Sequence, residues 1–245
     1  TDLSDNYKLQ GVVADINMRD SMRTYHPENV VAELLTRTDT TSASISCGDF
    51  MLRLNAHGGY KRLMRHGDKV LAELKRQMEQ KYIDQLKLRS LLPEMCLTLS
   101  ASKENVFTRM LNRKGMDFKS TFIDMDVSPV DGINGIVRID SLMASGIQLD
   151  TLRLDVKSDS VKTVFDGRIA NNRHNPQYVF TALFGGALYE RGVFFGTRVL
   201  DSHDRLGVAL GMKAAMEQGG IRISVGGPVA PVFGYKRFSV NKDNY

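Results

Sequence analysis

Short segments of alternating apolar and polar residues follow one another from about residue 118 to residue 238. Gly, Asn, Asp and Pro residues, which favour turns, separate these segments. Within residues 147–157, for example, Leu152, Leu154 and Val156 stand at alternate positions. This spacing predicts antiparallel β-strands with short connections rather than βαβ units. The expected strands are residues 118–127, 133–139, 147–157, 161–170, 178–184, 193–200, 206–212, 221–225 and 232–238.

The N-terminal part of the chain shows the same period in residues 7–16, 30–38 and 42–55. A turn at residues 38–41 is expected to join the last two segments into a hairpin. The alternation in the last segment slips by one position at Gly48. Because a slip at glycine is typical of a β-bulge, we expect one bulged strand here.

Residues 59–82 change to a helical period. One face of this helix would carry Leu63, Gly67, Val70, Leu71, Leu74 and Met78, and we expect that face to pack on the sheet. A second short helix over residues 83–92 would end before Pro93. Further expected elements are a strand at residues 94–100 and a helix at residues 103–114, with Ser102 as its N-cap and Gly115 just beyond its end.

These elements predict a mainly β fold, an antiparallel meander that curls into an open groove or half-barrel, with an inserted helical block. The expected parts are a β segment at residues 1–58, a helical insertion at 59–115 and a β meander at 116–245. They would form one structural unit, since 245 residues with 42% hydrophobic content suit a single fold. The apolar residues of the meander could instead fill a closed sandwich, and composition does not separate the two arrangements.

The positive charge is concentrated in the helical block. Residues 59–92 contain nine basic and four acidic residues, an excess that equals the net charge of +5 for the whole chain. Such a helix could contact anionic lipid headgroups, or it could simply turn its solvated side outward, and we favour the second interpretation. The basic residues lack interleaved aromatic residues, so no nucleic-acid partner is expected.

No catalytic or metal-binding pattern accompanies these elements. The sequence has no P-loop, HExxH or CxxC motif, and no histidine lies at ligand spacing from another histidine or a cysteine. We therefore expect no enzyme activity, no metal and no cofactor. The paired carboxylates Asp124 and Asp126 fit a solvated outer face better than acid–base chemistry. Cys47 and Cys96 could pair, but two buried thiols are the favoured interpretation.

We expect the chain to be a segment of a longer protein, because it begins at Thr1 and its ends read as the interior of a domain. No stretch approaches the ~20 consecutive apolar residues that a membrane-spanning helix needs.

Several strings of residues resemble one family in their order along the chain. Residues 47–50 (CGDF) precede LRLN at 52–55, and SPVDGING follows at 128–135. NNRHNPQ occupies residues 171–177, and GYKRF occupies 234–238. Together these strings resemble TamB (translocation and assembly module) proteins of Bacteroidetes-type bacteria, which belong to the AsmA-like group of bridge proteins.

This resemblance implies a long periplasmic β structure with an apolar groove, in a parent protein anchored in the inner membrane. It implies that the protein carries phospholipid toward the outer membrane, supports outer-membrane biogenesis and works with a TamA-type β-barrel partner. The helical block at residues 59–115 departs from a uniform groove and is expected to cap it. The candidate lipid-lining residues are Leu152, Leu154, Val156, Phe165, Ile169, Phe180, Phe195, Leu206, Val208, Leu210, Ile221 and Ile223.

Three other interpretations remain open at the level of sequence. The chain could be a scaffold that templates outer-membrane protein strands by β-augmentation. It could be a closed sandwich that only spaces other modules. It could also be an enzyme that uses the helical block as a lid, which would require His57 or His66 beside a carboxylate in a cleft.

Overall fold

The structure is a computed structural model that describes residues 6–19, 24–82, 84–217, 220–226 and 230–240. It is mainly β, as the alternation predicts, and nearly all strands belong to one antiparallel sheet of 16 strands. In the N-terminal half the strands are β1 (Tyr7–Val13), β2 (Met18–Arg19), β3 (Thr24–Tyr25), β4 (Val30–Thr36), β5 (Thr40–Cys47), β6 (Phe50–His57), β7 (Met95–Ala101), β8 (Met116–Asp117) and β9 (Ser120–Ser128). The remaining strands are β10 (Gly132–Ala144), β11 (Ile147–Ser158), β12 (Thr163–Asn171), β13 (Phe180–Tyr189), β14 (Gly192–Leu200), β15 (Leu206–Glu217), β16 (Gly220–Val225), β17 (Val232–Phe233) and β18 (Lys236–Arg237).

The main sheet is a meander in which sequence neighbours are spatial neighbours. Its order runs from β1 through β4, β5, β6, β7 and β9 to β15, and then to β17 and β18. Short strands attach at two places, where β8 pairs with β10 and β16 pairs with β15, while β2 and β3 form a separate pair. Each strand is antiparallel to its neighbour, including β6 and β7, which are joined by the long segment that contains two helices.

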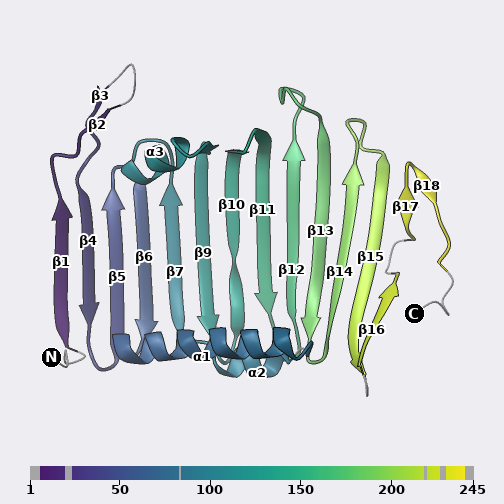
Figure 1. Cartoon of the computed structure of the whole chain (residues 1–245), viewed down its shortest axis with the longest axis horizontal. Coiled ribbons are helices and arrows are strands. Elements are labelled where there is room, and N and C mark those ends of the chain that lie inside the picture. The colour runs from purple at the N-terminus through teal and green to yellow at the C-terminus, as the bar shows by residue number, and fades with distance from the viewer. Residues whose placement is uncertain (1–5, 20–23, 83, 218–219, 227–229, 241–245) are drawn as a thin grey trace.

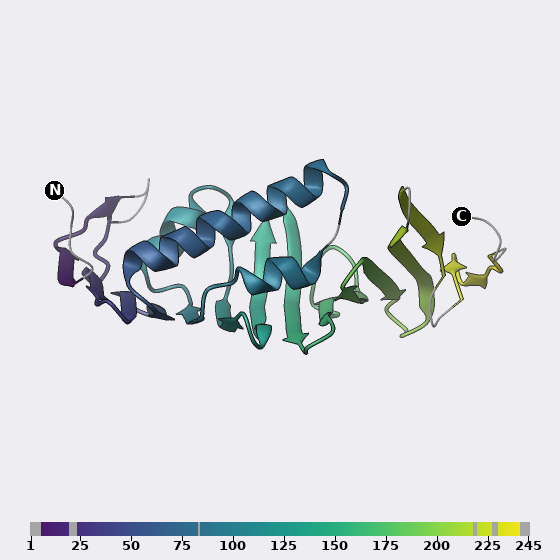
Figure 2. The same cartoon turned by 90° about the horizontal axis from the view of Figure 1, so that it is seen from below.

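The sheet is open. Figure 1 shows β1 at one lateral edge and the C-terminal strands β16–β18 at the other, far apart. Viewed from below, the strands form one layer, and no second sheet covers either side in the described residues (Figure 2). This arrangement agrees with the predicted open groove and is not the closed sandwich that the sequence left possible.

Three helices accompany the sheet: α1 (Tyr60–Glu79), α2 (Gln85–Ser90) and α3 (Val106–Asn112). They lie on one side of the sheet, with α1 and α2 across one end of the central strands and α3 near the other end (Figures 1 and 2). None of the helices in the described part of the chain is long and apolar enough to cross a membrane. Residues 59–115, expected as a helical insertion, also contain β7, which lies between β6 and β9 within the sheet.

The predicted β-bulge at Gly48 is wrong, because residues 42–55 form two strands instead of one. Cys47 of β5 pairs with Phe50 of β6, so Gly48 and Asp49 are the two residues of a hairpin turn. Gly48 has a φ of +57°, the left-handed conformation that such a turn requires and that glycine adopts without strain. The alternation slips because the chain reverses direction, not because a strand bulges.

The predicted cap of the third helix is also wrong. Asn105, which is fully buried, is the N-cap of α3, and its Oδ1 accepts a hydrogen bond of 2.7 Å from the backbone N–H of Thr108. Its Nδ2 donates to Oδ1 of Asp49 at 2.7 Å, which links the helix to the β5–β6 turn. Ser102, the expected cap, instead offers its carbonyl oxygen to Asn105 and Thr108.

The two cysteines differ in their surroundings. Both are free; Cys47 is buried, as expected, whereas Cys96 is exposed, contrary to the expectation of two buried thiols. Cys96 lies opposite Asp126 in the neighbouring strand, and a hydrogen bond to that carboxylate raises the pKa of the thiol. The register explains the exposure, because Cys96 and Asp126 lie on the side of the sheet opposite to Leu97 and Met125.

Candidate functional site

One face of the sheet is apolar from edge to edge. Residues directly opposite each other in antiparallel strands point to the same side, so the strand register traces rows across the sheet. One such row crosses thirteen strands without a polar side chain. In order from β1 to β16 it consists of Leu9, Leu34, Ala43, Leu54, Leu97, Met125, Gly135, Val156, Phe165, Gly186, Phe195, Met212 and Val225. We call the side that carries this row the apolar face.

The opposite side is polar over most of its width. The next row along the strands begins at β1 with Gln10 and Glu33, and continues through Ser44 of β5 and Arg53 of β6. Farther along, the same row reaches Asp155 of β11 and Asp166 of β12. We call this side the polar face. Alternation with a period of two along each strand thus gathers the apolar rows on one side, while the other side is mainly polar and carries apolar residues such as Leu183 and Phe194 over β13 and β14.

The apolar face is covered by protein only in part. Among the described residues, the buried apolar side chains are Cys47, Ala56, Ala101, Val106, Ala187, Ala209 and Val232. No leucine, isoleucine, methionine or phenylalanine is in that set, whereas Phe195 is 41% exposed and Ile223 is 54% exposed. The accessible surface is 16,007 Å², against about 11,000 Å² for a compact protein of this mass. Most of the apolar side chains that would form a core therefore remain accessible to a ligand.

All twelve residues predicted to line a lipid groove lie on the apolar face. Pairings such as Leu152 with Ile169 and Val156 with Phe165 join them across neighbouring strands. Leu206 follows by alternation with Val208 in β15, beside the register shift at the end of β14. The sequence pattern therefore identified which residues share a side, although it could not show that the side is open.

The same face extends through the N-terminal strands, which the list of candidate residues omitted. A second row contains Ile45 of β5, Leu52 of β6 and Leu99 of β7, and continues to Ile123 and Val137. These residues also occupy alternate positions in the sequence, so the same reasoning could have included them. The apolar face therefore extends over about twice as many strands as the predicted lining residues do.

The helices reach the apolar face near the two ends of its strands. The ring of Phe107 in α3 lies against Phe50, with ring centroids 4.5 Å apart. Gln85 of α2 donates from Nε2 to Oγ1 of Thr163 at 3.3 Å. Both Phe50 and Thr163 belong to the apolar face by their register. These contacts close part of each end and leave the middle of the face open.

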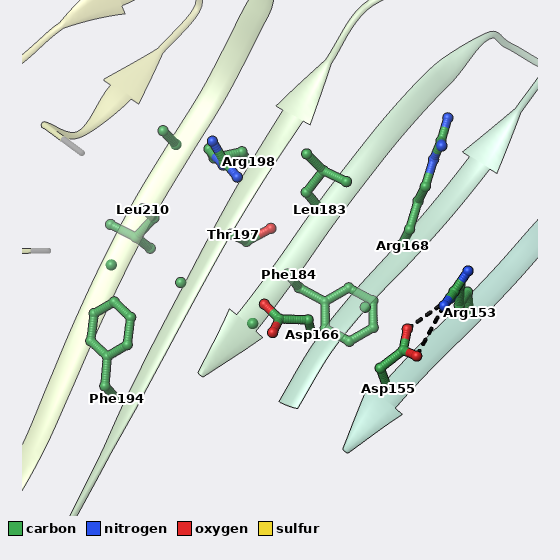
Figure 3. A pocket seen from close by; sticks show the side chains of 15 residues that line it. Arg153, Asp155, Asp166, Arg168, Leu183, Phe184, Phe194, Thr197, Arg198 and Leu210 are labelled. Carbon is green, nitrogen blue, oxygen red and sulfur yellow. Dashed lines mark hydrogen bonds and ion pairs between the residues drawn. The ribbon is translucent and has the colours of Figure 1, made fainter. Parts of the chain in front are cut away.

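A separate hollow of about 610 Å³ lies mainly on the polar face, over β11–β15. Its floor is a row of three glycines in register, Gly185, Gly196 and Gly211, which present backbone without side chains. Arg168 and Arg198 stand on either side of Leu183 at one margin (Figure 3). The polar face thus has a local depression, while the apolar face is a continuous surface.

The charges beside this hollow are partly neutralised. Nε of Arg153 donates to Oδ2 of Asp155 at 2.7 Å (Figure 3), and this hydrogen bond lowers the pKa of the carboxyl and raises the pKa of the guanidinium. Both groups are well exposed to solvent, so the pair adds little stability. Arg168 and Arg198 have no ion-pair partner within the described ranges.

The enzyme interpretation places His57 or His66 beside a carboxylate in a cleft, and the described residues do not show that pairing. Nδ1 of His66 lies 3.0 Å from the carbonyl oxygen of Leu91 and not beside a carboxylate. His57 is an exposed residue at the end of β6. In the part of the chain that the structure describes, no three His, Cys, Asp or Glu side chains are grouped to hold a metal ion. Asp124 and Asp126 lie on the polar face, in agreement with the interpretation of a solvated surface.

The geometry of the site is that of a broad, non-specific apolar surface with a polar reverse side. No family model, no curated protein and no solved structure matches the chain.

Proposed function

We propose that this chain is an internal segment of a TamB-like periplasmic bridge protein, and that its apolar face binds phospholipid acyl chains on their way to the outer membrane. The observation that carries the proposal is the uninterrupted row of apolar residues from Leu9 to Val225, together with its exposure. A soluble monomer rarely exposes a contiguous apolar patch larger than a few hundred Å² unless that patch binds something.

The chemistry of the face suits a ligand that must be held and also moved. Each buried CH₂ group of an acyl chain contributes ~0.8 kcal/mol without any preferred direction. Neighbouring strands lie about 4.8 Å apart and present equivalent apolar side chains, so an acyl chain that shifts by one strand loses little contact energy. The polar face keeps the other side of the layer hydrated. In the parent protein, an inner-membrane anchor and a TamA-type outer-membrane partner would define the two ends of the route.

The experiment is native mass spectrometry of the purified chain, with lipid extraction from the same sample. Met212→Asp places a charge on the apolar face, and Lys213→Asp is the matched control because it lies on the polar face of the same strand. Phe165→Asp, Val208→Asp and Leu210→Asp extend the test to other positions. We expect phospholipid to accompany the wild type and Lys213→Asp and to be lost from the apolar-face variants. A lipid-free wild type, or equal loss from Lys213→Asp, would contradict the proposal.

A second candidate function is assembly of outer-membrane proteins by β-strand addition. The observation that favours it is β1, whose outer edge has no partner strand in the described residues and whose seven residues are almost all exposed. An exposed edge of this length is a template for an incoming strand. Peptides from outer-membrane barrel strands would then protect the β1 amides from hydrogen exchange. If the peptides do not protect the β1 amides while lipid still binds the chain, strand addition is contradicted and the lipid-binding proposal remains.

A further inference from the structure

Helix α1 is rotated away from the orientation that its sequence predicts. Leu71, Leu74 and Met78 were expected to pack on the sheet, but Leu71 is 66% exposed and Met78 is 73% exposed. The residues that are buried on this helix are instead polar, Glu73 and Gln77. The prediction of a docked apolar face is therefore wrong for the second half of the helix, whereas Leu63, Gly67 and Val70 of the same predicted face are half-buried.

A polar clamp explains this orientation. The side-chain amide of Gln77 accepts from the backbone N–H of Asp84 at 2.8 Å and donates to the carbonyl oxygen of Asp84 at 3.1 Å. Gln77 also donates to Oε1 of Glu73 at 2.8 Å, and Arg76 holds the same carboxylate. These hydrogen bonds fix the side of α1 that faces the α1–α2 connection. The apolar stripe, which is displaced by about a quarter turn, remains unpacked.

The exposed side chains form one continuous stripe. Tyr60, Met64, Leu71, Leu74 and Met78 follow at intervals of three, four and seven residues, and all are at least 39% exposed. Residues at this spacing lie on one line along a helix. The stripe runs through the helix from its first residue to its last turn.

Basic residues lie across the helix from the stripe. The helix carries six basic and three acidic residues, and by the helical period Arg62, Arg65, Lys69 and Arg76 lie on the side away from the stripe. Arg65 and Lys69, near the middle of that side, have no ion-pair partner in the described part of the chain. A helix with an apolar stripe on one side and unpaired cationic groups on the other suits a surface that has apolar depth and negative headgroups.

We infer that α1 is an interfacial helix that docks this end of the sheet on an anionic lipid bilayer. The stripe enters the boundary between headgroups and acyl chains, and Arg65 and Lys69 lie among the negatively charged headgroups. The inference goes beyond the proposed lipid-binding role of the sheet and does not depend on it. If both hold, docking brings one end of the apolar face to the bilayer, because α1 crosses the ends of the central strands (Figure 1).

The test is co-sedimentation of the full chain with vesicles of equal parts phosphatidylglycerol and phosphatidylcholine, compared with vesicles of phosphatidylcholine alone. We expect binding to the anionic vesicles that is about tenfold or more stronger, and that weakens as salt rises. Leu71→Glu places a charge in the apolar stripe and should abolish binding. The double variant Arg65→Glu with Lys69→Glu reverses the charge of the cationic residues and should abolish the preference for anionic vesicles. Ile147→Glu is the matched control, since Ile147 is 57% exposed and is the first residue of β11, whose last residues lie toward α1 (Figure 1).

Three results would overturn the inference. The first is a wild type that binds neither vesicle, and the second is equal binding to both. The third is binding that Leu71→Glu leaves unchanged while Met212→Asp on the apolar face abolishes it. Phospholipid that co-purifies with a chain unable to bind vesicles would refute docking by α1 and still support lipid binding by the sheet, so the two proposals fail separately.

Discussion

The ring of Phe165 lies directly over Gly186 on the apolar face. The two residues are opposite each other in β12 and β13, and a Cβ added at Gly186 would lie 2.6 Å from Cζ of Phe165. In the neighbouring pair the two residue types are exchanged between the strands, because the ring of Phe184 in β13 lies over Gly167 in β12. In each pair an aromatic ring covers the backbone that glycine leaves bare, which compensates for the missing side chain.

The two glycines should differ in their tolerance of a methyl group. A Cβ at Gly186 would also collide with the backbone carbonyl oxygen of Phe194, which cannot move without breaking the sheet. At Gly167 the collision is with the Phe184 ring alone, which can rotate toward the open face. We expect Gly186→Ala to lower the free energy of unfolding by about 3 kcal/mol and Gly167→Ala by about 1 kcal/mol, in urea titrations. Equal losses would mean that ring packing, not the backbone contact, sets the cost.

Two turn glycines with positive φ, Gly48 between β5 and β6 and Gly146 between β10 and β11, form a second matched pair. Gly48 has a φ of +57°, and a Cβ there would collide with the backbone carbonyl oxygen of Glu104. Gly146, with a φ of +78°, has no atom within 4 Å of that position. Gly146→Ala should therefore cost only the backbone strain, about 1–2 kcal/mol, and Gly48→Ala clearly more. Thermal unfolding of the two variants measures the difference, and a similar shift for both would contradict a specific contact with Glu104.

The sequence was sufficient to predict the strands and the side that their apolar residues share, because a period of two leaves each residue only two possible sides. It did not predict the turn at Gly48, although Gly48-Asp49 between two alternating segments is a hairpin signal. It misplaced the cap of α3, because the choice of Asn105 depends on Asp49, which lies 56 positions away in sequence. The N-cap residue of a helix can therefore depend on a contact with a residue that is distant in sequence.

The exposure of α1 could not be predicted for the same reason. Periodicity identifies which residues share a helix face, but it does not say which face the rest of the protein will cover. Here the hydrogen bonds of Gln77 to Asp84 decide the orientation, and they form only when the chain reverses after α1. Likewise, alternation on the sheet is the same for a closed sandwich and an open layer. The missing second layer became visible only in three dimensions.

In addition to the pairing of β17 with β15, one tyrosine side chain links the C-terminal hairpin to the rest of the sheet. Oη of Tyr235 donates to Oδ2 of Asp201 at 2.9 Å, and this hydrogen bond raises the pKa of the phenol. In Asp201→Asn the negative acceptor is lost and Arg205 remains nearby, so the pKa of Tyr235 should fall toward or below its ordinary value of 10.0. NMR titration of ring-labelled tyrosine measures it, with the signal assigned by its absence in Tyr235→Phe. An unchanged titration in Asp201→Asn would show that the contact is not formed in solution.

The clamp that orients α1 should weaken in acid. Glu73 accepts hydrogen bonds from Nη2 of Arg76 at 2.6 Å and from Nε2 of Gln77 at 2.8 Å, and these lower its pKa from 4.5 to about 2. Because the folded-state pKa is the lower one, the contribution of Glu73 to stability is fully present above pH 4.5 and is lost as the pH falls toward 2. Glu73→Gln should therefore be less stable than the wild type near neutral pH, and the gap should close over that window. Thermal unfolding from pH 6 to pH 2.5 measures the gap, and Glu79→Gln on the exposed side of the same helix controls for the change in net charge. A gap that stays constant across the window would mean that the carboxylate of Glu73 is not held by Arg76 and Gln77, and that another contact determines which side of α1 is exposed.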